Sequence, residues 1–463
     1  MISEDYFDGK KKIHMLGIGG IGMCGIAEYL HRKGYEITGS DAVSSQNTRR
    51  LANTGVNISY GHAEDNLPED TELVIYTSAV NPRNHELEKA KRLGIKQIKR
   101  AEALGNIVND KFLIAVSGTH GKTTTASMIA KLLIDNKFDP DVFVGGNLDF
   151  LNDGTSRIGH GEYAVVEADE YDRSFHFLKP DIAVITNIES DHLDIYFDID
   201  DIKNSFRKFL ECGKKDLKII ACGDDQNIQD VIKKFKSKTT YGLGKKNDYT
   251  INEVTQTEKM VSFFLKNTEL NIRVFGNYNI LNASAAYLAG QELKIRQENF
   301  NLSMKTFSGA KRRLELKYEN GIRIYDDYAH HPTEVRASLE TLKKIFKKRI
   351  IVIFQPHLYS RTKEFYKEFG EAFSIADILM LAKIYPAREE MIEGVTSGLI
   401  LNEFLKSGKE GYYFENSDVL MKELENICGS EDVIVFQGAG DITDMCDRFV
   451  IKIKNKTKDI VPL

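Results

Sequence analysis

The chain has 463 residues, which is too long for one ordinary core and predicts about three domains. Its composition, 42% hydrophobic and 28% charged, is that of a folded globular protein without low-complexity segments. The net charge of -5 lacks the basic excess that a nucleic-acid partner or an anionic membrane surface would require.

The cysteines and the N-terminal residues bear on the compartment. The five cysteines are odd in number, far apart and never in a CxxC pair, which is typical of free thiols in a reducing compartment. The N-terminus, MISEDYFDGKKK, is polar and has no apolar signal core, and no run approaches the roughly 18 apolar residues of a membrane span. These features predict a soluble cytoplasmic protein without membrane insertion, and they leave its oligomeric state open.

Short apolar strands alternate with amphipathic helical stretches along the chain, which predicts an α/β fold with parallel sheets. The alternation falls into three series, and we expect domains at residues 1–107, 108–309 and 310–463. Within the second series, residues 249–276 have the alternating texture of a hairpin. Polar clusters follow several strands, where ligands bind in open parallel sheets.

The first polar cluster is the stretch IHMLGIGGIG. Gly17, Gly19 and Gly22 spell G-x-G-x-x-G after a short apolar run, and Asp41 follows 19 residues after Gly22. This pattern is typical of a dinucleotide-binding turn, in which an acidic residue at that distance meets a ribose hydroxyl. A nicotinamide cofactor is one interpretation, and another phosphate-bearing ligand is the alternative.

The strongest signal is LIAVSGTHGKTTTASMIAKLL at 113–133, a strand that leads through a glycine-rich loop into a helix. Its backbone suits a polyphosphate, a lysine reaches the terminal phosphates, and a threonine hydroxyl can hold Mg²⁺. The loop is a shortened Walker pattern, because Val116 stands where the full pattern has glycine. We predict that ATP or a close relative is bound by Gly118, Thr119, His120, Gly121, Lys122, Thr123 and Thr124.

Two acidic stretches, EADEYDRS at 167–174 and TNIESDHLD at 186–194, follow buried-looking strands. If those strands neighbour the phosphate-loop strand, their side chains lie beside the phosphates. Carboxylate oxygens are the usual ligands of Mg²⁺, so either Glu167 or Asp169 is a candidate ligand. His192 is a second candidate, with a hydrogen-bonded structural histidine as the alternative.

Four stretches together resemble the Mur ligase family: GIGGIG, SGTHGKTTT, EADE with TNIESDHLD, and DDYAHHPTEV. FQPHLYSRTKEF and YPAREE add to the resemblance, which extends over residues ~13 to ~441. It implies an N-terminal Rossmann-like domain for a UDP-sugar, a central P-loop ATPase domain and a C-terminal Rossmann-like domain for an amino acid. It also implies an ATP-dependent ligase of peptidoglycan synthesis that joins L-alanine to the carboxylate of UDP-N-acetylmuramate.

The resemblance implies two chemical steps. The muramyl carboxylate attacks the γ-phosphate of ATP and forms an acyl phosphate, and the amine of L-alanine then displaces phosphate from the acyl carbon. Lys122 would bridge the β- and γ-phosphates. Thr123 and Glu167 would hold a first Mg²⁺, and His192 a second.

The remaining site residues are implied by the same resemblance. The glycine loop would receive a UDP diphosphate in place of a nicotinamide cofactor, so that the UDP-sugar contacts are Gly17, Gly19, Gly20, Ile21, Asp41 and Ser78.

Asn279 and Asn282 would contact adenine, although Tyr278 stands where the family usually has histidine. Arg313 and Asp327 would contact the nucleotide from the third domain, with the neighbouring Arg312 as an alternative. The implied amino-acid site comprises Tyr328, His330, Arg361 and Arg388.

Several points stay open at this stage. A nicotinamide dehydrogenase leaves GTHGKTTT unexplained, and a folylpolyglutamate synthetase-like ligase leaves the N-terminal domain unexplained. A murein tripeptide ligase would share the ATPase core, and a non-catalytic nucleotide-binding regulator would not need Lys122, Glu167 and His192. Leu358 stands where many relatives have arginine, and Cys24 is either an inert buried thiol or a reactive one.

Overall fold

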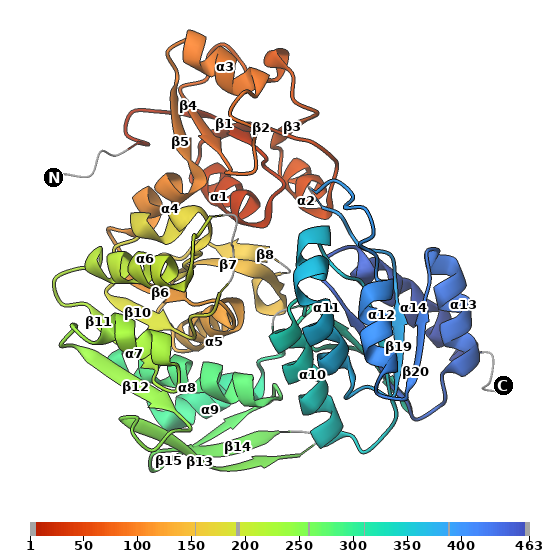
Figure 1. Cartoon of the computed structure of the whole chain (residues 1–463). Helices are drawn as coiled ribbons and strands as arrows, with labels where there is room; N and C mark the ends of the chain where they lie inside the picture. Colours follow the sequence, from red (N-terminus) through yellow and green to blue (C-terminus); the bar gives the residue numbers. More distant parts are fainter. Residues whose placement is uncertain are drawn as a thin grey trace. The chain divides into compact units, whose positions relative to one another are not determined.

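The computed structural model describes residues 6–152, 154–190, 195–257, 260–309, 311–387 and 389–458, with side chains up to residue 455. The chain forms two compact units (Figure 1). The first comprises the residues up to 255 together with 261–273 and 279–307, and the second comprises 256–260, 274–278 and the residues from 308 onward.

The N-terminal part of the first unit is a parallel sheet with the strand order β3-β2-β1-β4-β5. Because the order reverses between β1 and β4, a crevice for ligands is expected at the carboxyl ends of these two strands. The strands are β1 (Lys12–Leu16), β2 (Glu36–Asp41), β3 (Asn57–Tyr60), β4 (Leu73–Tyr76) and β5 (Lys96–Lys99). The helices are α1 (Ile21–Arg32), α2 (Gln46–Asn53), α3 (His85–Arg92) and α4 (Arg100–Val108), with a 3-10 turn at Glu64–Asn66.

A larger sheet follows, with the order β15-β14-β13-β12-β11-β10-β6-β9-β7-β8. Its strands are β6 (Phe112–Ser117), β7 (Asp141–Leu148), β8 (Gly154–Arg157), β9 (Tyr163–Glu167), β10 (Ile182–Ile185), β11 (Lys218–Cys222), β12 (Lys238–Gly242), β13 (Tyr249–Gln256), β14 (Val261–Leu265) and β15 (Thr268–Ile272). The helices are α5 (Lys122–Asp135), α6 (Ile199–Glu211), α7 (Gln226–Ile232), α8 (Asn277–Glu292) and α9 (Gln297–Lys305), with 3-10 turns at Asp149–Leu151 and Tyr171–Phe177.

Two sequence predictions about this sheet are confirmed. The phosphate-loop strand β6 pairs in parallel with β9 on one side and with β10 on the other, so the acidic stretches that follow β9 and β10 flank the loop. The predicted hairpin is the antiparallel pair β14–β15, in which Val261 lies opposite Ile272.

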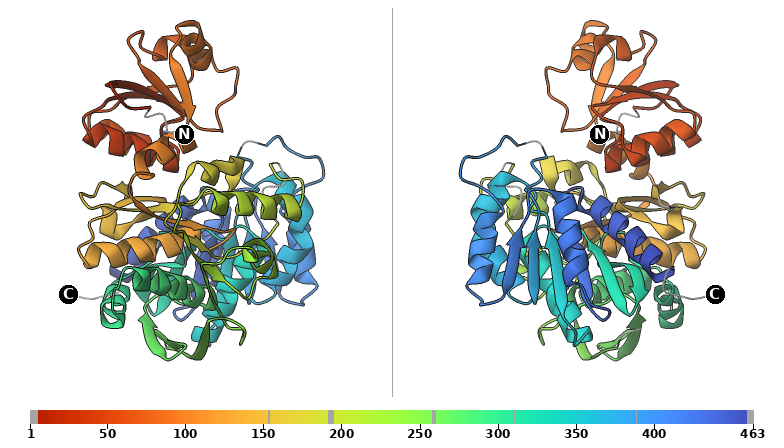
Figure 2. Two further views of the ribbon diagram at one scale, coloured as in Figure 1. Left: turned by 90° about the vertical axis from the view of Figure 1, so that its left-hand side faces the viewer. Right: turned by 90° about the vertical axis from the view of Figure 1, so that its right-hand side faces the viewer.

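The second unit contains a sheet with the order β16-β17-β21-β18-β19-β20, parallel except for the edge strand β16. Helices pack on both of its faces (Figure 2), because alternate side chains of each strand enter two separate apolar clusters. The strands are β16 (Glu315–Asn320), β17 (Ile322–Asp327), β18 (Ile350–Phe354), β19 (Ile378–Leu381), β20 (Glu410–Tyr413) and β21 (Val433–Gln437). The helices are α10 (Pro332–Ile345), α11 (Tyr359–Phe373), α12 (Gly398–Leu405), α13 (Ser417–Ile427) and α14 (Ile442–Lys458).

The fold is therefore α/β with three mainly parallel sheets, as the sequence predicts. Among the described residues, none of the helices combines the length and the apolar character that crossing a bilayer requires.

Candidate active site

The phosphate loop joins the end of β6 to the start of α5 through two glycines in the left-handed region, Gly118 (φ +138°) and Gly121 (φ +82°). A β-carbon at Gly118 would lie 2.1 Å from Thr186 Oγ1, and one at Gly121 would lie 2.6 Å from Asn282 Oδ1. Only glycine fits these positions. No side chain in the described structure caps α5 at Gly121, which leaves the first-turn amides of the helix for an anion.

The end of β10 holds this loop in shape. Thr119 N donates to Asn187 O at 3.1 Å, and His120 N donates to Asn187 Oδ1 at 2.7 Å. Asn187 Nδ2 and Thr186 Oγ1 both donate to His120 O. Thr186 and Asn187 open the TNIE stretch, but the acidic pattern of that stretch predicts no role for either of them.

Lys122, the first residue of α5, is half-buried, and its ammonium faces carboxylates. Its Nζ lies 2.8 Å from Glu170 Oε1 and also donates to the carbonyls of Gly118 and Thr119. Burial alone would lower the pKa of Lys122, but the nearby carboxylates, Glu170 foremost, outweigh it and raise the pKa. The lysine is therefore a cation at neutral pH, and phosphate oxygens would compete with Glu170 for it.

Thr123 and Glu167 meet beside the loop. Thr123 Oγ1 donates to Glu167 Oε1 at 3.0 Å, and Gly145 N donates to Glu167 Oε2 at 2.6 Å. A hydroxyl and a carboxylate oxygen form a donor set that suits Mg²⁺. Asp169, the alternative ligand, accepts instead from Tyr171 N and lies 4.0 Å from Arg100. His192 lies outside the described residues, so its proposed role stays a prediction.

The predicted adenine contacts Asn279 and Asn282 are buried in α8, next to the loop. Asn282 Nδ2 donates to Asn279 Oδ1 at 3.2 Å, and Asn282 lies close to Gly121. Thr124, the last residue of the predicted loop set, is buried in the first turn of α5. The structure thus brings the predicted ATP residues of the first unit to one place.

The glycine loop of the N-terminal sheet is bonded to the end of β2. Gly17 N and Ile18 N donate to Ser40 O at 2.8 and 3.1 Å. Gly19 N donates to Asp41 Oδ2 at 2.8 Å. Asp41 therefore shapes the loop with one carboxylate oxygen. Gly20 precedes α1 without a side-chain cap in the described structure, so the amides from Ile21 onward face the crevice.

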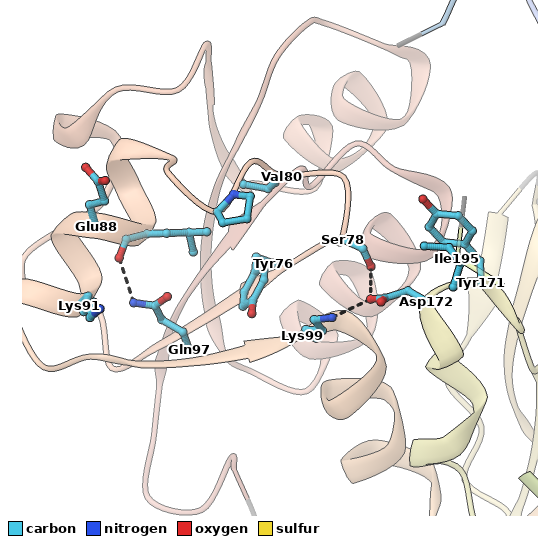
Figure 3. A pocket seen from close by; sticks show the side chains of 12 residues that line it. Tyr76, Ser78, Val80, Glu88, Lys91, Gln97, Lys99, Tyr171, Asp172 and Ile195 are labelled. Atoms are coloured by element: carbon cyan, nitrogen blue, oxygen red, sulfur yellow. Dashed lines mark hydrogen bonds and ion pairs between the residues drawn. The ribbon is translucent and has the colours of Figure 1, made fainter. Parts of the chain in front are cut away.

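Ser78 lies after β4, where it contacts the segment that follows β9. Its Oγ donates to Asp172 Oδ2 at 2.9 Å, and Lys99 Nζ lies 2.7 Å from the same oxygen, as Figure 3 shows. These residues line a cavity of about 460 Å³, together with Tyr76 and Tyr171. The cavity gives room for a ligand beside Ser78.

In the second unit, Asp327 and the two candidate arginines, Arg312 and Arg313, differ in the groups that they contact. Asp327 is buried at the end of β17 and accepts from Ser338 Oγ at 2.6 Å and from Gln437 Nε2 at 3.0 Å. Burial raises its pKa. Arg312 donates to the backbone carbonyls of Gly438 and Gly440, whereas Arg313 lies 3.7 Å from Glu334. This geometry gives Arg312 a backbone-holding role and favours Arg313 as the nucleotide contact.

Tyr278 and His331 stand beside predicted site residues of the second unit. Burial raises the pKa of Tyr278, and the neighbouring Asp327 adds to the effect. His331 caps α10, where its Nδ1 lies 3.4 Å from Thr333 N and Pro332 takes the first helical position. His331 and Pro332 together start the helix, because proline suits the first helical position.

Three residues predicted to bind the amino acid, Tyr328, His330 and Arg361, lie near the carboxyl ends of β17 and β18. His330 Nδ1 lies 3.0 Å from Tyr328 O, and Arg361 Nη1 lies 3.4 Å from His357 Nδ1. The His330 and His357 rings lie 6.1 Å apart. Burial lowers the pKa of His330 to about 4, so its imidazole is neutral at physiological pH. His357 belongs to the FQPHLYSRTKEF stretch, and it joins this region although it is not among the predicted site residues.

Two further positions complete this region. Leu358 precedes α11 with φ +73°, a backbone conformation that residues other than glycine rarely adopt. Its N donates to Tyr385 O. Arg388 lies outside the described residues, so its predicted contact with the amino acid stays a prediction.

Cys24 is fully buried in α1, just beyond the glycine loop. Burial raises the pKa of its thiol to about 11, although Arg50 Nη2 lies 3.2 Å from the sulfur. Because the thiolate is the reactive form of cysteine, this geometry favours the inert reading of Cys24.

Family models and full-length relatives identify the class of this site. Residues 12–112 match "Mur ligase family, catalytic domain", residues 116–290 match "Mur ligase middle domain", and residues 312–440 match "Mur ligase, glutamate ligase domain". Together with the relatives below, these matches show that the chain belongs to the Mur ligase family.

Two relatives by sequence and one by structure are UDP-N-acetylmuramate–L-alanine ligases. The UDP-N-acetylmuramate–L-alanine ligase of Clostridium tetani is 41% identical over 462 residues, which cover 97% of this chain and 100% of that one. The enzyme of the same name from Clostridium kluyveri is 40% identical over 441 residues, covering 93% and 96%. The crystal structure of UDP-N-acetylmuramate-alanine ligase MurC from Thermotoga maritima is 30% identical with a TM-score of 0.84, covering 96% and 99%. A murein peptide ligase from Psychrobacter arcticus, 24% identical with a TM-score of 0.70 and covering 98% and 100%, shares the fold.

Proposed function

We propose that this chain is an ATP-dependent ligase that joins L-alanine to the carboxylate of UDP-N-acetylmuramate, the first peptide step of peptidoglycan precursor synthesis. The observation that carries this proposal is the convergence of Lys122, Thr123 and Glu167 at the end of β6, in a chain whose full-length relatives have that activity in their names. We place the reaction in the cytoplasm, where ATP is available.

The first step is phosphoryl transfer from ATP to the muramyl carboxylate, which yields ADP and an acyl phosphate. Such transfers depend on positioning and charge neutralisation more than on covalent help from the protein. The first-turn amides of α5 and the ammonium of Lys122 would bind the β- and γ-phosphates. Glu170 keeps that ammonium beside the loop until the nucleotide arrives.

In the second step the amine of L-alanine attacks the acyl carbon, and phosphate leaves through a tetrahedral intermediate. The amino acid would bind in the second unit near Tyr328 and His330, with the Arg361 guanidinium on its carboxylate and a further contact from Arg388. Neutral His330 can accept a hydrogen bond from the amine without repelling it. Arg313 and Asp327 would contact the nucleotide.

Mg²⁺ would be held by Thr123 and Glu167, whose hydroxyl and carboxylate oxygens fit this ion, and His192 is the proposed ligand of a second ion. When bound, the ions neutralise charge between the muramyl carboxylate and the phosphates. The UDP diphosphate would lie on the glycine loop at Gly17, Gly19, Gly20 and Ile21, with Asp41 and Ser78 beside it. We keep the domain boundaries 1–107, 108–309 and 310–463 as part of the proposal, and the matched family segments support them.

The proposal predicts strict co-dependence of substrates. ADP release from Mg²⁺-ATP should require both UDP-N-acetylmuramate and L-alanine, and omission of either should reduce it to background. Glycine, L-serine and the tripeptide L-Ala-D-Glu-diaminopimelate are tested in place of L-alanine, with ADP measured by a coupled assay. Turnover with the tripeptide alone would instead make the chain a murein tripeptide ligase with the same ATP site.

A further inference from the structure

A carboxylate with no exposed surface, that of Glu86, lies between α3 and the N-terminal sheet. Glu86 Oε2 lies 2.8 Å from His14 Nε2, and both side chains are fully buried. Glu86 Oε1 accepts from Ser40 Oγ at 2.8 Å and lies 2.9 Å from His62 Nδ1. We call these four residues, His14, Ser40, His62 and Glu86, the Glu86 cluster.

The Glu86 cluster joins four segments of the sheet. Glu86 lies in the first turn of α3, which Asn84 caps by accepting from Glu86 N at 2.8 Å. His14 belongs to β1, Ser40 to β2, and His62 to the loop after β3. The carboxylate therefore lies beneath α3 against the buried middle of β1, and Ser40 links it to the carboxyl end of β2.

The same cluster is linked to the glycine loop by one residue. The backbone carbonyl of Ser40 accepts from Gly17 N and Ile18 N, and the next residue, Asp41, accepts from Gly19 N. Three successive amides of the loop are thus fixed by the last two residues of β2. The side chain of Ser40 is in turn held by Glu86. The Glu86 carboxylate therefore influences the position of the glycine loop through Ser40.

Hydrogen bonds stabilise the negative charge of the Glu86 carboxylate. Burial alone would raise the pKa of Glu86, but hydrogen bonds from His14, His62 and Ser40 outweigh it and lower the pKa. The carboxylate is therefore ionised at neutral pH. An ionised carboxylate near a diphosphate site would repel the ligand, and imidazoles on both of its oxygens reduce that repulsion.

We propose that Glu86 is a positioning residue of the nucleotide-sugar site: by holding Ser40 and His62 it fixes the end of β2 and hence the glycine loop that receives the diphosphate. This inference rests on the proposed function, because the diphosphate is that of UDP-N-acetylmuramate. In the part of the chain that the structure describes, the hydrogen bonds of Glu86 go to the N-terminal sheet domain and none goes to the ATP loop. Its replacement should therefore affect the binding of one substrate.

The test is Glu86→Gln, which keeps the size of the side chain and removes its charge and one of its acceptors. Calorimetric titration of UDP-N-acetylmuramate into the full-length protein without ATP or L-alanine should show a Kd raised about tenfold. In turnover, KM for UDP-N-acetylmuramate should rise by a similar factor, while kcat and KM for ATP stay at the wild-type values. Glu69→Gln, which changes an exposed carboxylate of the same sheet domain, is the matched control and should leave Kd unchanged.

Ser40→Ala is the second variant, because it removes only the hydroxyl that bonds to Glu86 and His62 and leaves the pair of Glu86 and His14. It should raise Kd in the same direction by about threefold, and it decides the matter if Glu86→Gln does not fold. An unchanged Kd in the folded variants would overturn the inference. A fall in kcat together with a rise in KM for ATP would also overturn it, since Glu86 would then support the whole fold. Wild-type protein that binds ATP but no UDP-N-acetylmuramate would contradict the proposed function itself and the inference with it.

Discussion

Replacing Lys122 with alanine should lower kcat by at least about a thousandfold and leave the binding of UDP-N-acetylmuramate unchanged. Lys122 supplies a side-chain cation at the phosphate loop, and its ammonium lies between Glu170 and the loop carbonyls. The glycine loop of the N-terminal sheet is a separate element, so its diphosphate contacts should survive. Steady-state turnover and calorimetric titration of the UDP-sugar measure the two effects.

The lysine variant also removes the ion pair between Lys122 and the buried Glu170. A buried carboxylate that loses its partner destabilises a protein, so the melting temperature has to be followed. The double variant Lys122→Ala with Glu170→Gln should regain stability without regaining turnover. Lys131→Ala, on the same helix in an ion pair with Asp135, is the control and should turn over normally. A single Lys122→Ala variant within tenfold of wild-type kcat would contradict the mechanism.

Replacing Glu167 with glutamine should lower kcat by about a hundredfold and raise the Mg²⁺ concentration required for half-maximal turnover. The amide keeps one oxygen but carries no charge, so the donor set with Thr123 attracts a divalent cation less strongly. Mg²⁺ titrations of turnover, and of ADP binding by calorimetry, measure the change.

A matched control for this variant is Glu162→Gln, an exposed carboxylate just before the same strand. It should behave as wild type in both titrations. If Glu167→Gln showed the wild-type Mg²⁺ requirement, the metal-binding role of Glu167 would be wrong, and Asp169 would become the first alternative to test.

The parts of the site that the sequence predicts are those encoded by short local patterns. The phosphate loop, with Gly118 and Gly121 at fixed spacing before Lys122, is visible in seven successive residues, and the structure places it between a strand and a helix. The flanking positions of β9 and β10 follow from the rule that polar residues gather at the carboxyl ends of neighbouring strands. Neither prediction requires knowledge of contacts between residues that are far apart in the chain.

Other parts depend on contacts between residues far apart in the chain, which leave no local pattern. Ser78 meets Asp172 across 94 positions, and Glu86 meets His14 across 72. In the sequence His14 is one polar residue in an apolar strand, and its partners, Thr38 of β2 and Glu86 of α3, lie far away in the chain. The sequence likewise does not decide whether Arg312 or Arg313 contacts the nucleotide, because the backbone contacts of Arg312 come from residues far away in the chain.

The most direct test of the account follows the oxygen atoms of the muramyl carboxylate. UDP-N-acetylmuramate labelled with ¹⁸O at both carboxylate oxygens is incubated with the protein, Mg²⁺-ATP and L-alanine. The ¹⁸O content of the products is then measured by mass spectrometry. The account predicts UDP-N-acetylmuramoyl-L-alanine that retains one ¹⁸O and inorganic phosphate that carries the other, because the acyl phosphate breaks at the carbon–oxygen bond. Product accompanied by unlabelled phosphate would contradict the acyl-phosphate step, and the absence of product with L-alanine would contradict the proposed activity.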